Sequence, residues 1–363
     1  MTVLMTPRQR LKTVLAGHIP DRVPVVDISF WPETLERWRK EGLPSGITPA
    51  DHFALDCIER FSFDGSLCLS AEIIEESEQW RVRRDANGVL IKEWRDWHIS
   101  YSPPVRLDCL VKTWDDWLKV KSRLRVSPHR ITEQQVQTYD EWRHEDRFVV
   151  ISPVEPMWFL IEQLTGFEVG LPMAIEQPDL AADILNAYTD FILGMCQLAV
   201  DEGMTFDALW FFSDLCYRNG MLFSPKVYRE LLMPCHRRVK AWCETEGMPL
   251  MLHCDGDMRE FIPLLIEVGF DVVQPLEARC GNDVRELKPL YGTDIAFFGN
   301  ISADVMAYGS DAEIEEEIVT KLRAAKEGGG YIYHSDHSIP PTVSLQRYEQ
   351  VIALVRQHGQ YDS

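Results

Sequence analysis

One stretch, residues 249–277, carries the pattern from which the fold can be inferred, and it reads PLMLHCDGDMREFIPLLIEVGFDVVQPLE. It contains two short apolar runs, 249–252 and 272–276, with an amphipathic segment between them. Short apolar runs that alternate with helices are typical of parallel strands, which are covered on both faces. Each run ends in polar residues, so the stretch predicts a strand–helix–strand unit with polar groups where its strands end.

The same unit recurs along the chain from residue 148 onward. Between the apolar runs lie helical patterns, of which the segment 178–202 has the longest apolar stripe. Ser224 before Pro225 marks one helix start, and the capping box of Ser310 and Glu313 marks another. The predicted strands of this part are 148–154, 208–212, 249–252, 272–276, 295–298 and 331–333.

The first 145 residues are less regular. Residues 7–16 predict a helix, and the apolar run at 23–28 predicts a buried strand, with 65–69 as the candidate for one more. Together with the six later runs this makes eight strands. The predicted fold class is therefore α/β, a (β/α)8 TIM barrel formed by one domain, residues 1–363, with an irregular N-terminal part, 1–145.

Two further observations bear on the architecture. Residues 79–97 read as a β-hairpin inserted in the N-terminal part, because apolar residues flank an Asn87-Gly88 turn signal. The alternative to a closed barrel is an open, doubly wound sheet. No GxGxxG motif follows the first strand, which removes the usual reason to prefer a dinucleotide-binding fold.

Composition excludes several classes of function. The chain has 363 residues and a formal net charge of −20, which argues against a nucleic-acid partner. No run approaches about 18 apolar residues, the length that a membrane-spanning helix needs. Residues 1–20 lack an apolar segment, so no secretory signal is expected. Nine cysteines without a CxxC pair suit a reducing compartment, and the predicted location is the cytoplasm.

The ends of the predicted strands carry the candidate functional residues, because chemistry in a barrel of this kind gathers at the C-terminal ends of the strands. His253 and Asp255 are two residues apart on one strand and so share a face, and His334 and Asp336 repeat this arrangement. Imidazoles and carboxylates, with Glu277 from the adjacent strand, are ligand types that suit Zn²⁺. The alternatives are a hydrogen-bonded structural pair and a metal-free acid–base site.

Other polar and aromatic residues at the same end have two readings each. Asp214 either acts on a substrate or caps the next turn, and Glu155 either binds a substrate or begins a helix. Asn300 follows the seventh strand and is a further candidate for substrate binding. Phe30 and Trp31, after the first strand, either line an apolar pocket or form a buried lid.

Several motifs resemble the uroporphyrinogen decarboxylase superfamily. They are TPRQR (6–10), DRVP (21–24), NG (219–220), LFSP (222–225), HCDG (253–256), PLE (275–277), GGG (328–330) and HSDHSIP (334–340). The resemblance extends from about residue 6 to residue 358 and implies a (β/α)8 barrel. Members of the superfamily often form homodimers, so a homodimer is a possible assembly for this chain.

The resemblance favours one branch of the superfamily. True uroporphyrinogen decarboxylases carry an RQAGR segment after the first strand, whose arginines bind the substrate propionates, and an essential Asp after the second strand. Here the first region reads ISFWPET (28–34), with no arginine before Arg37, and the second is matched to LCLSAE (67–72). A substrate with many carboxylates would be poorly held there. The chain is therefore more similar to the corrinoid-linked methyltransferases.

The resemblance also implies a cofactor and a partner. Those methyltransferases hold zinc with a His-x-Cys pair and a later Cys, whereas Asp255 and His337 stand in the matching places here. Oxygen and nitrogen ligands suit a substrate bound through oxygen, such as a methoxylated aromatic compound or another methyl ether. The chain has no DxHxxG motif, so the corrinoid would be supplied by a partner protein.

The hypothesis from sequence is therefore a zinc-dependent methyltransferase of the O-demethylase type. Zinc would be held by His253, Asp255, Glu277 and His337. Asp214, His334 and Asp336 would orient the substrate or donate a proton. Two rival hypotheses are a decarboxylase or lyase acting on a small carboxylated substrate, and a metal-bearing binding subunit without turnover.

Overall fold

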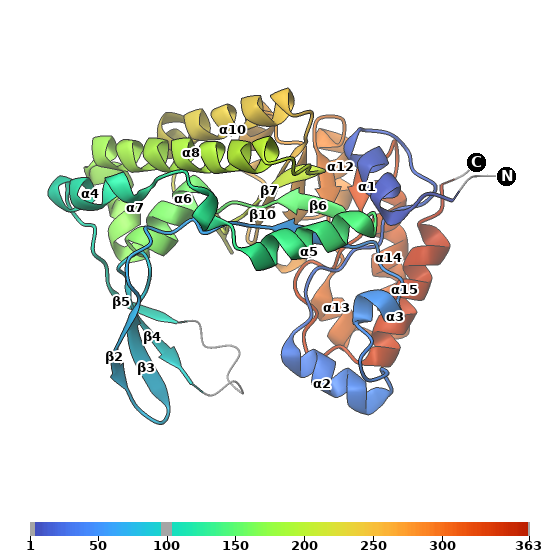
Figure 1. The fold of residues 1–363 in the computed structure, drawn as a ribbon. Coiled ribbons are helices and arrows are strands. Elements are labelled where there is room, and N and C mark those ends of the chain that lie inside the picture. Colours follow the sequence, from blue (N-terminus) through green and yellow to red (C-terminus); the bar gives the residue numbers. More distant parts are fainter. Residues whose placement is uncertain (1–3, 96–103, 362–363) are drawn as a thin grey trace.

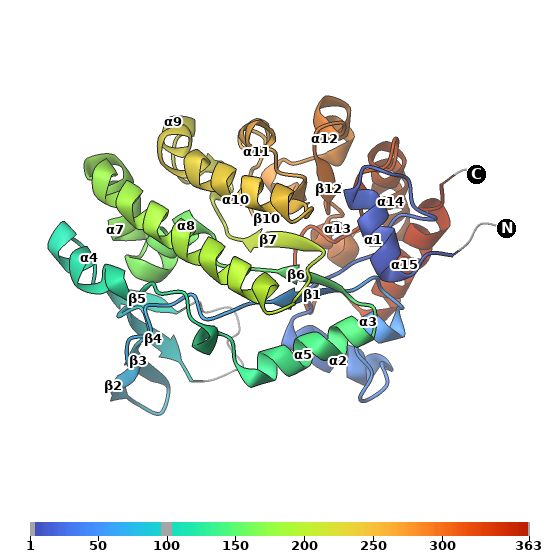
Figure 2. The ribbon, with the colours of Figure 1, turned by 45° about the horizontal axis from the view of Figure 1, so that its top comes forward.

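The structure is a computed structural model that describes residues 4–95 and 104–361. Its centre is a curved sheet of seven parallel strands in the order β1-β6-β7-β10-β11-β12-β13. Their bounds are β1 (Ile58–Phe61), β6 (Phe148–Ile151), β7 (Ala208–Phe212), β10 (Leu250–Cys254), β11 (Val272–Pro275), β12 (Ala296–Phe298) and β13 (Tyr331–Ile332). In Figure 2 helices surround these strands on the outside, which is the arrangement of a (β/α)8 barrel.

The predicted first strand, 23–28, closes the sheet into a barrel. Val25 forms a parallel bridge with Tyr333, and the amide of Val26 donates to the Tyr333 carbonyl at 3.0 Å. On the other side, the Asp56 amide donates to the Val25 carbonyl at 2.7 Å. The segment therefore lies between β13 and the start of β1. This confirms the eight-stranded barrel expected from the sequence, and the open sheet is excluded.

One predicted strand is wrong. Residues 65–69 form a loop, and the strand that follows 23–28 in the barrel is β1. Its sequence, IERF, is not an apolar run, because Glu59 reaches an ion pair with Arg147 outside while Arg60 faces the barrel interior. The expected hairpin is confirmed over its described residues, whereas residues 96 and 97 lie outside them.

This hairpin belongs to a four-stranded antiparallel sheet that projects from the barrel (Figure 1). The strands are β2 (Glu72–Glu76), β3 (Trp80–Arg84), β4 (Leu90–Trp94) and β5 (Val105–Asp108). Within the Asn87-Gly88 turn, Gly88 adopts a positive φ of +82° and Asn87 does not. The buried Asn87 instead accepts a hydrogen bond from the Leu67 amide, which ties the sheet to the loop before it.

The helices begin where their capping residues predict. Thr6 caps α1, Ser224 precedes Pro225 at the start of α9, and the Ser310 capping box begins α14. The α-helices are α1 (Pro7–Leu15), α2 (Pro32–Glu41), α3 (Pro49–His52), α4 (Trp114–Val120), α5 (Glu133–His144), α6 (Pro156–Trp158), α7 (Phe167–Glu176), α8 (Pro178–Asp201), α9 (Pro225–Val227), α10 (Met233–Thr245), α11 (Ile262–Val268), α12 (Val284–Tyr291), α13 (Ala303–Tyr308), α14 (Asp311–Ala325) and α15 (Leu345–His358). None of the helices in the described part of the chain has the length and apolar character required to span a bilayer.

Alternation along the strands divides the side chains between two cores. One core fills the barrel and includes Trp210, Met251 and Phe298. The other lies between the strands and the surrounding helices and contains the fully buried Cys254. His253 and its neighbours therefore point into the C-terminal end of the barrel, where the apolar filling gives way to polar side chains.

Candidate metal site and cleft

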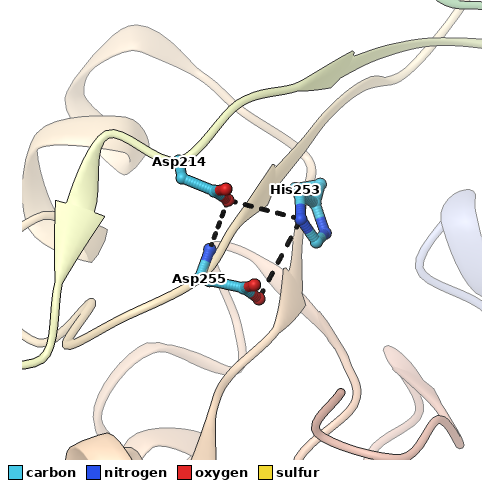
Figure 3. A group of neighbouring side chains, drawn as sticks. All are labelled: Asp214, His253 and Asp255. Carbon is cyan, nitrogen blue, oxygen red and sulfur yellow. Dashed lines mark hydrogen bonds and ion pairs between the residues drawn. The ribbon is translucent and has the colours of Figure 1, made fainter. Parts of the chain in front are cut away.

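Three side chains meet at the C-terminal ends of β7 and β10 (Figure 3). The Nε2 atom of His253 lies 3.4 Å from an oxygen of Asp214 and 3.9 Å from an oxygen of Asp255. One potential ligand atom from each residue lies within 4.8 Å of the other two. The register explains the meeting, because His253 is paired with Phe212 across the two strands, two residues before each carboxylate.

A chain of buried hydrogen bonds orients the His253 imidazole. Ile28 donates its amide hydrogen to Nε2 of His334 at 3.3 Å, so Nδ1 of that ring carries the proton and donates to the Ser335 carbonyl. Gln274 directs its amide nitrogen at the same Nε2, 3.5 Å away, and its oxygen lies 2.5 Å from Nδ1 of His253. His253 must donate from Nδ1, so its Nε2 lone pair faces the two carboxylates.

The charges at this site are not balanced by the protein. Oδ1 of Asp255 is buried and accepts no hydrogen bond from the described residues, and burial raises the pKa of this carboxyl group. Burial also raises the pKa of Asp214, but the interaction with the His253 side chain and the hydrogen bond donated by the Asp255 amide outweigh burial and lower that pKa. Two carboxylates and an imidazole lone pair turned toward one point form an oxygen–nitrogen donor set that a divalent cation fits.

Two predicted ligands lie beside this group of three. His337 places Nε2 3.7 Å from the second oxygen of Asp255, and one third of its side chain is exposed. Glu277 has both oxygens engaged, by the Gly256 amide at 3.0 Å, by the Cys280 thiol at 3.1 Å and by an ion pair with Arg279. Burial raises the Glu277 pKa, but these partners outweigh burial and lower it.

Three other predicted residues support the loops of the barrel mouth. Asp336 accepts amide hydrogen bonds from Ala278 at 2.9 Å and Ala303 at 2.8 Å, and burial raises its pKa to about 6. Asn300 is fully buried and bonds three backbone groups of neighbouring loops. His334 lies inside the barrel behind Gln274, and burial lowers its pKa. These side chains are engaged by the protein itself.

The remaining predicted residues lie elsewhere. Glu155 is fully buried, caps α6 through the Trp158 amide and bonds Nε2 of His236 at 2.9 Å. Phe30 packs edge-on against Trp38 and Tyr348. Trp31 is the residue that precedes α2 and is partly exposed. None of Glu155, Phe30 and Trp31 lines the cavity beside Asp214 and Asp255.

This cavity has a volume of about 560 Å³ and lies against the two carboxylates of the group. A short hairpin of β8 (Cys216–Tyr217) and β9 (Gly220–Met221) forms one wall, and the loop after β11 forms another. The lining residues are Asp214, Cys216, Tyr217, Arg218, Asp255, Gly256, Glu277, Arg279, Cys280 and Asp304.

The sequence does not identify three side chains of this region, those of Gln274, Arg60 and Arg218. Gln274 stands in the stretch QPLE, three residues before Glu277, and its position opposite His253 is known only from the pairing of β10 and β11. Arg60 belongs to the unrecognised strand β1. Arg218 lies at the tip of a hairpin too short to leave a periodic pattern.

Comparison with known proteins supports the fold and assigns the family. A profile of the uroporphyrinogen decarboxylase (URO-D) family matches residues 139–358. The chain belongs to this family. The family expected from the sequence is therefore confirmed, and the two sets of relatives below both include methyltransferases.

Among curated proteins, a methylated-thiol–coenzyme M methyltransferase from Methanosarcina mazei is 23% identical over 229 residues, 60% of this chain and 56% of that protein. A uroporphyrinogen decarboxylase from Hydrogenovibrio crunogenus is 22% identical over 187 residues, half of each chain. The matches thus span only about half the length of these relatives. Among solved structures, a methyltransferase from Methanosarcina mazei superposes with a TM-score of 0.63 at 16% identity and covers 97% of this chain and 99% of its own, which supports the barrel fold.

Proposed function

We propose that this protein is a metal-dependent methyltransferase that moves a methyl group between a small methylated substrate and the corrinoid of a separate protein. The observation that carries the proposal is the group of Asp214, His253 and Asp255, in which one carboxylate oxygen is buried without a hydrogen-bond partner in the described part of the chain. A relative in the same family is named as a methyltransferase of methylated thiols. The resemblance of the sequence to corrinoid-linked methyltransferases supports the corrinoid partner.

The proposed metal is zinc, held by Asp214, His253 and Asp255, with His337 as the fourth ligand from the rim. This set differs from the sequence hypothesis, because Asp214 enters it and Glu277, whose oxygens are engaged, leaves it. Bound zinc would supply a Lewis acid that stabilises negative charge on the atom losing the methyl group. Oxygen and nitrogen donors, without a thiolate, favour a methyl ether such as a methoxylated aromatic compound as the substrate.

The other residues of the mouth position these ligands. Gln274 and His334 keep the Nε2 lone pair of His253 directed at the two carboxylates. Asp336 and Asn300 hold the loops after β11 and β12 in place, so that the cavity stays open beside the ligands. Their proposed role is positioning rather than contact with the substrate.

A second candidate function, decarboxylation of a small carboxylated substrate, is favoured by one observation. The residue run that follows the second strand of the barrel is Ser62 to Asp64, and not 67–72 as the sequence suggested. Asp64 therefore stands after that strand, where the resemblance places the essential carboxylate of true decarboxylases. Asp64 accepts hydrogen bonds from the Ser66 amide and the Cys68 thiol, and the first loop, 28–34, contains no arginine.

Metal analysis and a methyl-transfer assay together test the proposal. We expect purified protein to contain about one zinc ion per chain and to transfer methyl groups from methoxylated compounds to a reduced corrinoid protein. His253→Ala and Asp255→Asn should lose both properties. Asp257→Asn is the matched control, because Asp257 lies on the same loop and pairs with Arg259 instead.

Three other results of these experiments would contradict the proposed function or favour one of its rivals. A His253→Ala protein with full metal content and full turnover would overturn the assignment. Turnover of a carboxylated substrate by metal-free protein would favour the decarboxylase, and an Asp64→Asn variant should then be inactive. Stoichiometric zinc without any turnover would favour a binding subunit.

A further inference from the structure

Arg60 projects from β1 into the C-terminal end of the barrel. The preceding inward residue of the strand, Ile58, packs on the interior core, and Arg60 donates to the Ser152 hydroxyl at 3.3 Å. Its guanidinium carbon lies 4.1 Å from the centroid of the Phe212 ring and 5.8 Å from that of Trp210. Arg60 therefore belongs to the same polar layer of the barrel as the metal-binding group.

Phe212 joins Arg60 to the proposed metal ligand. The His253 imidazole stacks on the Phe212 ring with a centroid distance of 3.6 Å and an interplanar angle of 9°. Two groups cannot occupy one face of a phenyl ring at these distances, so Arg60 and His253 lie on opposite faces. A single aromatic ring thus separates the guanidinium group from the imidazole.

The charge of Arg60 has no counterion among the residues that the structure describes. In residues 4–95 and 104–361 no carboxylate forms an ion pair with it, and the Ser152 hydroxyl takes one of its five N–H donors. The Arg60 side chain is exposed at the barrel mouth, and its partial burial there lowers its pKa without an opposing acidic group in the described part of the chain. By contrast, Arg10 and Arg143 near the other end of the barrel each pair with buried carboxylates. An arginine remains charged in such a place, so its unused donors are available to an anion.

We propose that Arg60 binds a carboxylate of the substrate, so that the substrate class of this enzyme is aromatic acids that carry a methyl ether. This inference rests on the proposed function and deepens it. The planar guanidinium group matches a carboxylate in a two-point hydrogen bond. Because both faces of Phe212 are occupied, the substrate extends past the edge of this ring, with its carboxylate at Arg60 and its methoxy group near His253.

A purely structural role for Arg60 predicts a different effect on stability. If packing on Phe212 and the Ser152 bond were its purpose, Arg60→Met would lower the free energy of unfolding. The Arg60 side chain is exposed to solvent, so its contacts contribute little to that free energy. Arg60→Met should therefore leave stability nearly unchanged, as measured by urea unfolding, while it removes binding of the acid.

The test measures ligand binding and needs no turnover. Isothermal titration compares 2-, 3- and 4-methoxybenzoate with uncharged methoxybenzene on the full-length protein. We expect the best acid to bind the wild type more tightly than methoxybenzene, and Arg60→Met to weaken acid binding about ten- to a hundredfold, the loss expected for a charge-assisted hydrogen-bonding group. Binding of methoxybenzene should stay the same. Arg60→Lys should lie between, and Arg285→Gln, at an exposed arginine paired with Asp283, should match the wild type.

The outcomes separate this inference from the proposed function. Equal affinity of the wild type for acids and methoxybenzene, or an unchanged preference in Arg60→Met, overturns the role of Arg60 even if methyl transfer is observed. Loss of acid binding in Arg60→Met supports it even if no zinc or turnover is found. Where turnover is found, Arg60→Met should raise KM for the acid and leave kcat nearly unchanged, because the carboxylate lies away from the reacting methyl group.

Discussion

Gln274 offers a direct test of how the His253 imidazole is held. The Gln274 side chain is 1% exposed, and its oxygen lies 2.5 Å from Nδ1 of His253. Replacing it with leucine keeps a similar volume but removes the only acceptor found for that ring nitrogen among the described residues. The imidazole would then be free to rotate or to move its proton to Nε2, the atom that faces the carboxylates.

Two quantities should change in Gln274→Leu. Loss of the group that orients a metal-binding histidine costs about 10- to 100-fold in metal affinity. A buried N–H left without an acceptor costs about 1–3 kcal/mol in the free energy of unfolding. Zinc affinity is measured at pH 7 by competition with a chromophoric chelator, and stability is measured by urea unfolding of the metal-free protein.

Gln274→Glu is the matched control, because it restores an acceptor on a side chain of the same length. It should therefore bind zinc more tightly than Gln274→Leu does. The reasoning would be refuted by a Gln274→Leu protein whose zinc affinity lies within about twofold of the wild type. In that case either the cation is not bound at Nε2 of His253, or another group holds the ring.

Three further predictions concern the framework of the barrel. Burial raises the pKa of Asp207, but hydrogen bonds from Arg8 and Arg143 outweigh burial and lower this pKa. The ionised Asp207 therefore stabilises the fold above about pH 4, and this stabilisation is lost as the pH falls through the folded-state pKa of Asp207. Asp207→Asn should therefore unfold about 3 kcal/mol more easily in urea at pH 7, with a deficit that narrows below about pH 4. His236→Leu should cost about 3 kcal/mol in the same assay, because it removes the imidazole partner of one buried Glu155 oxygen and leaves only the bond from the Trp158 amide to the other oxygen. Gly299→Ala should cost about 3 kcal/mol or more and lower the thermal midpoint, since φ is +139° and a Cβ would approach the Pro275 carbonyl oxygen to 1.9 Å.

The barrel could be predicted because most of its strands are apolar on both faces. Six runs after residue 148 lie between a filled interior and a layer of helices, so each reads as a continuous apolar segment. The same criterion fails for β1, where Glu59 pairs with Arg147 on one side and Arg60 enters the polar mouth on the other. A strand with a polar residue that points into the barrel mouth does not form a continuous apolar run. For this reason the sequence predicts neither β1 nor a role for Arg60.

The site could be predicted only in part for a related reason. Spacing alone marks His253 and Asp255, since two residues on one strand share a face, but Asp214 joins them through the register of β7 and β10. Carboxylates that look equivalent in sequence also differ in how many backbone amides they meet. Asp336 accepts two, whereas one oxygen of Asp255 accepts none. That difference depends on loop conformation, and it separates a carboxylate that holds the fold from one that remains available to a cation.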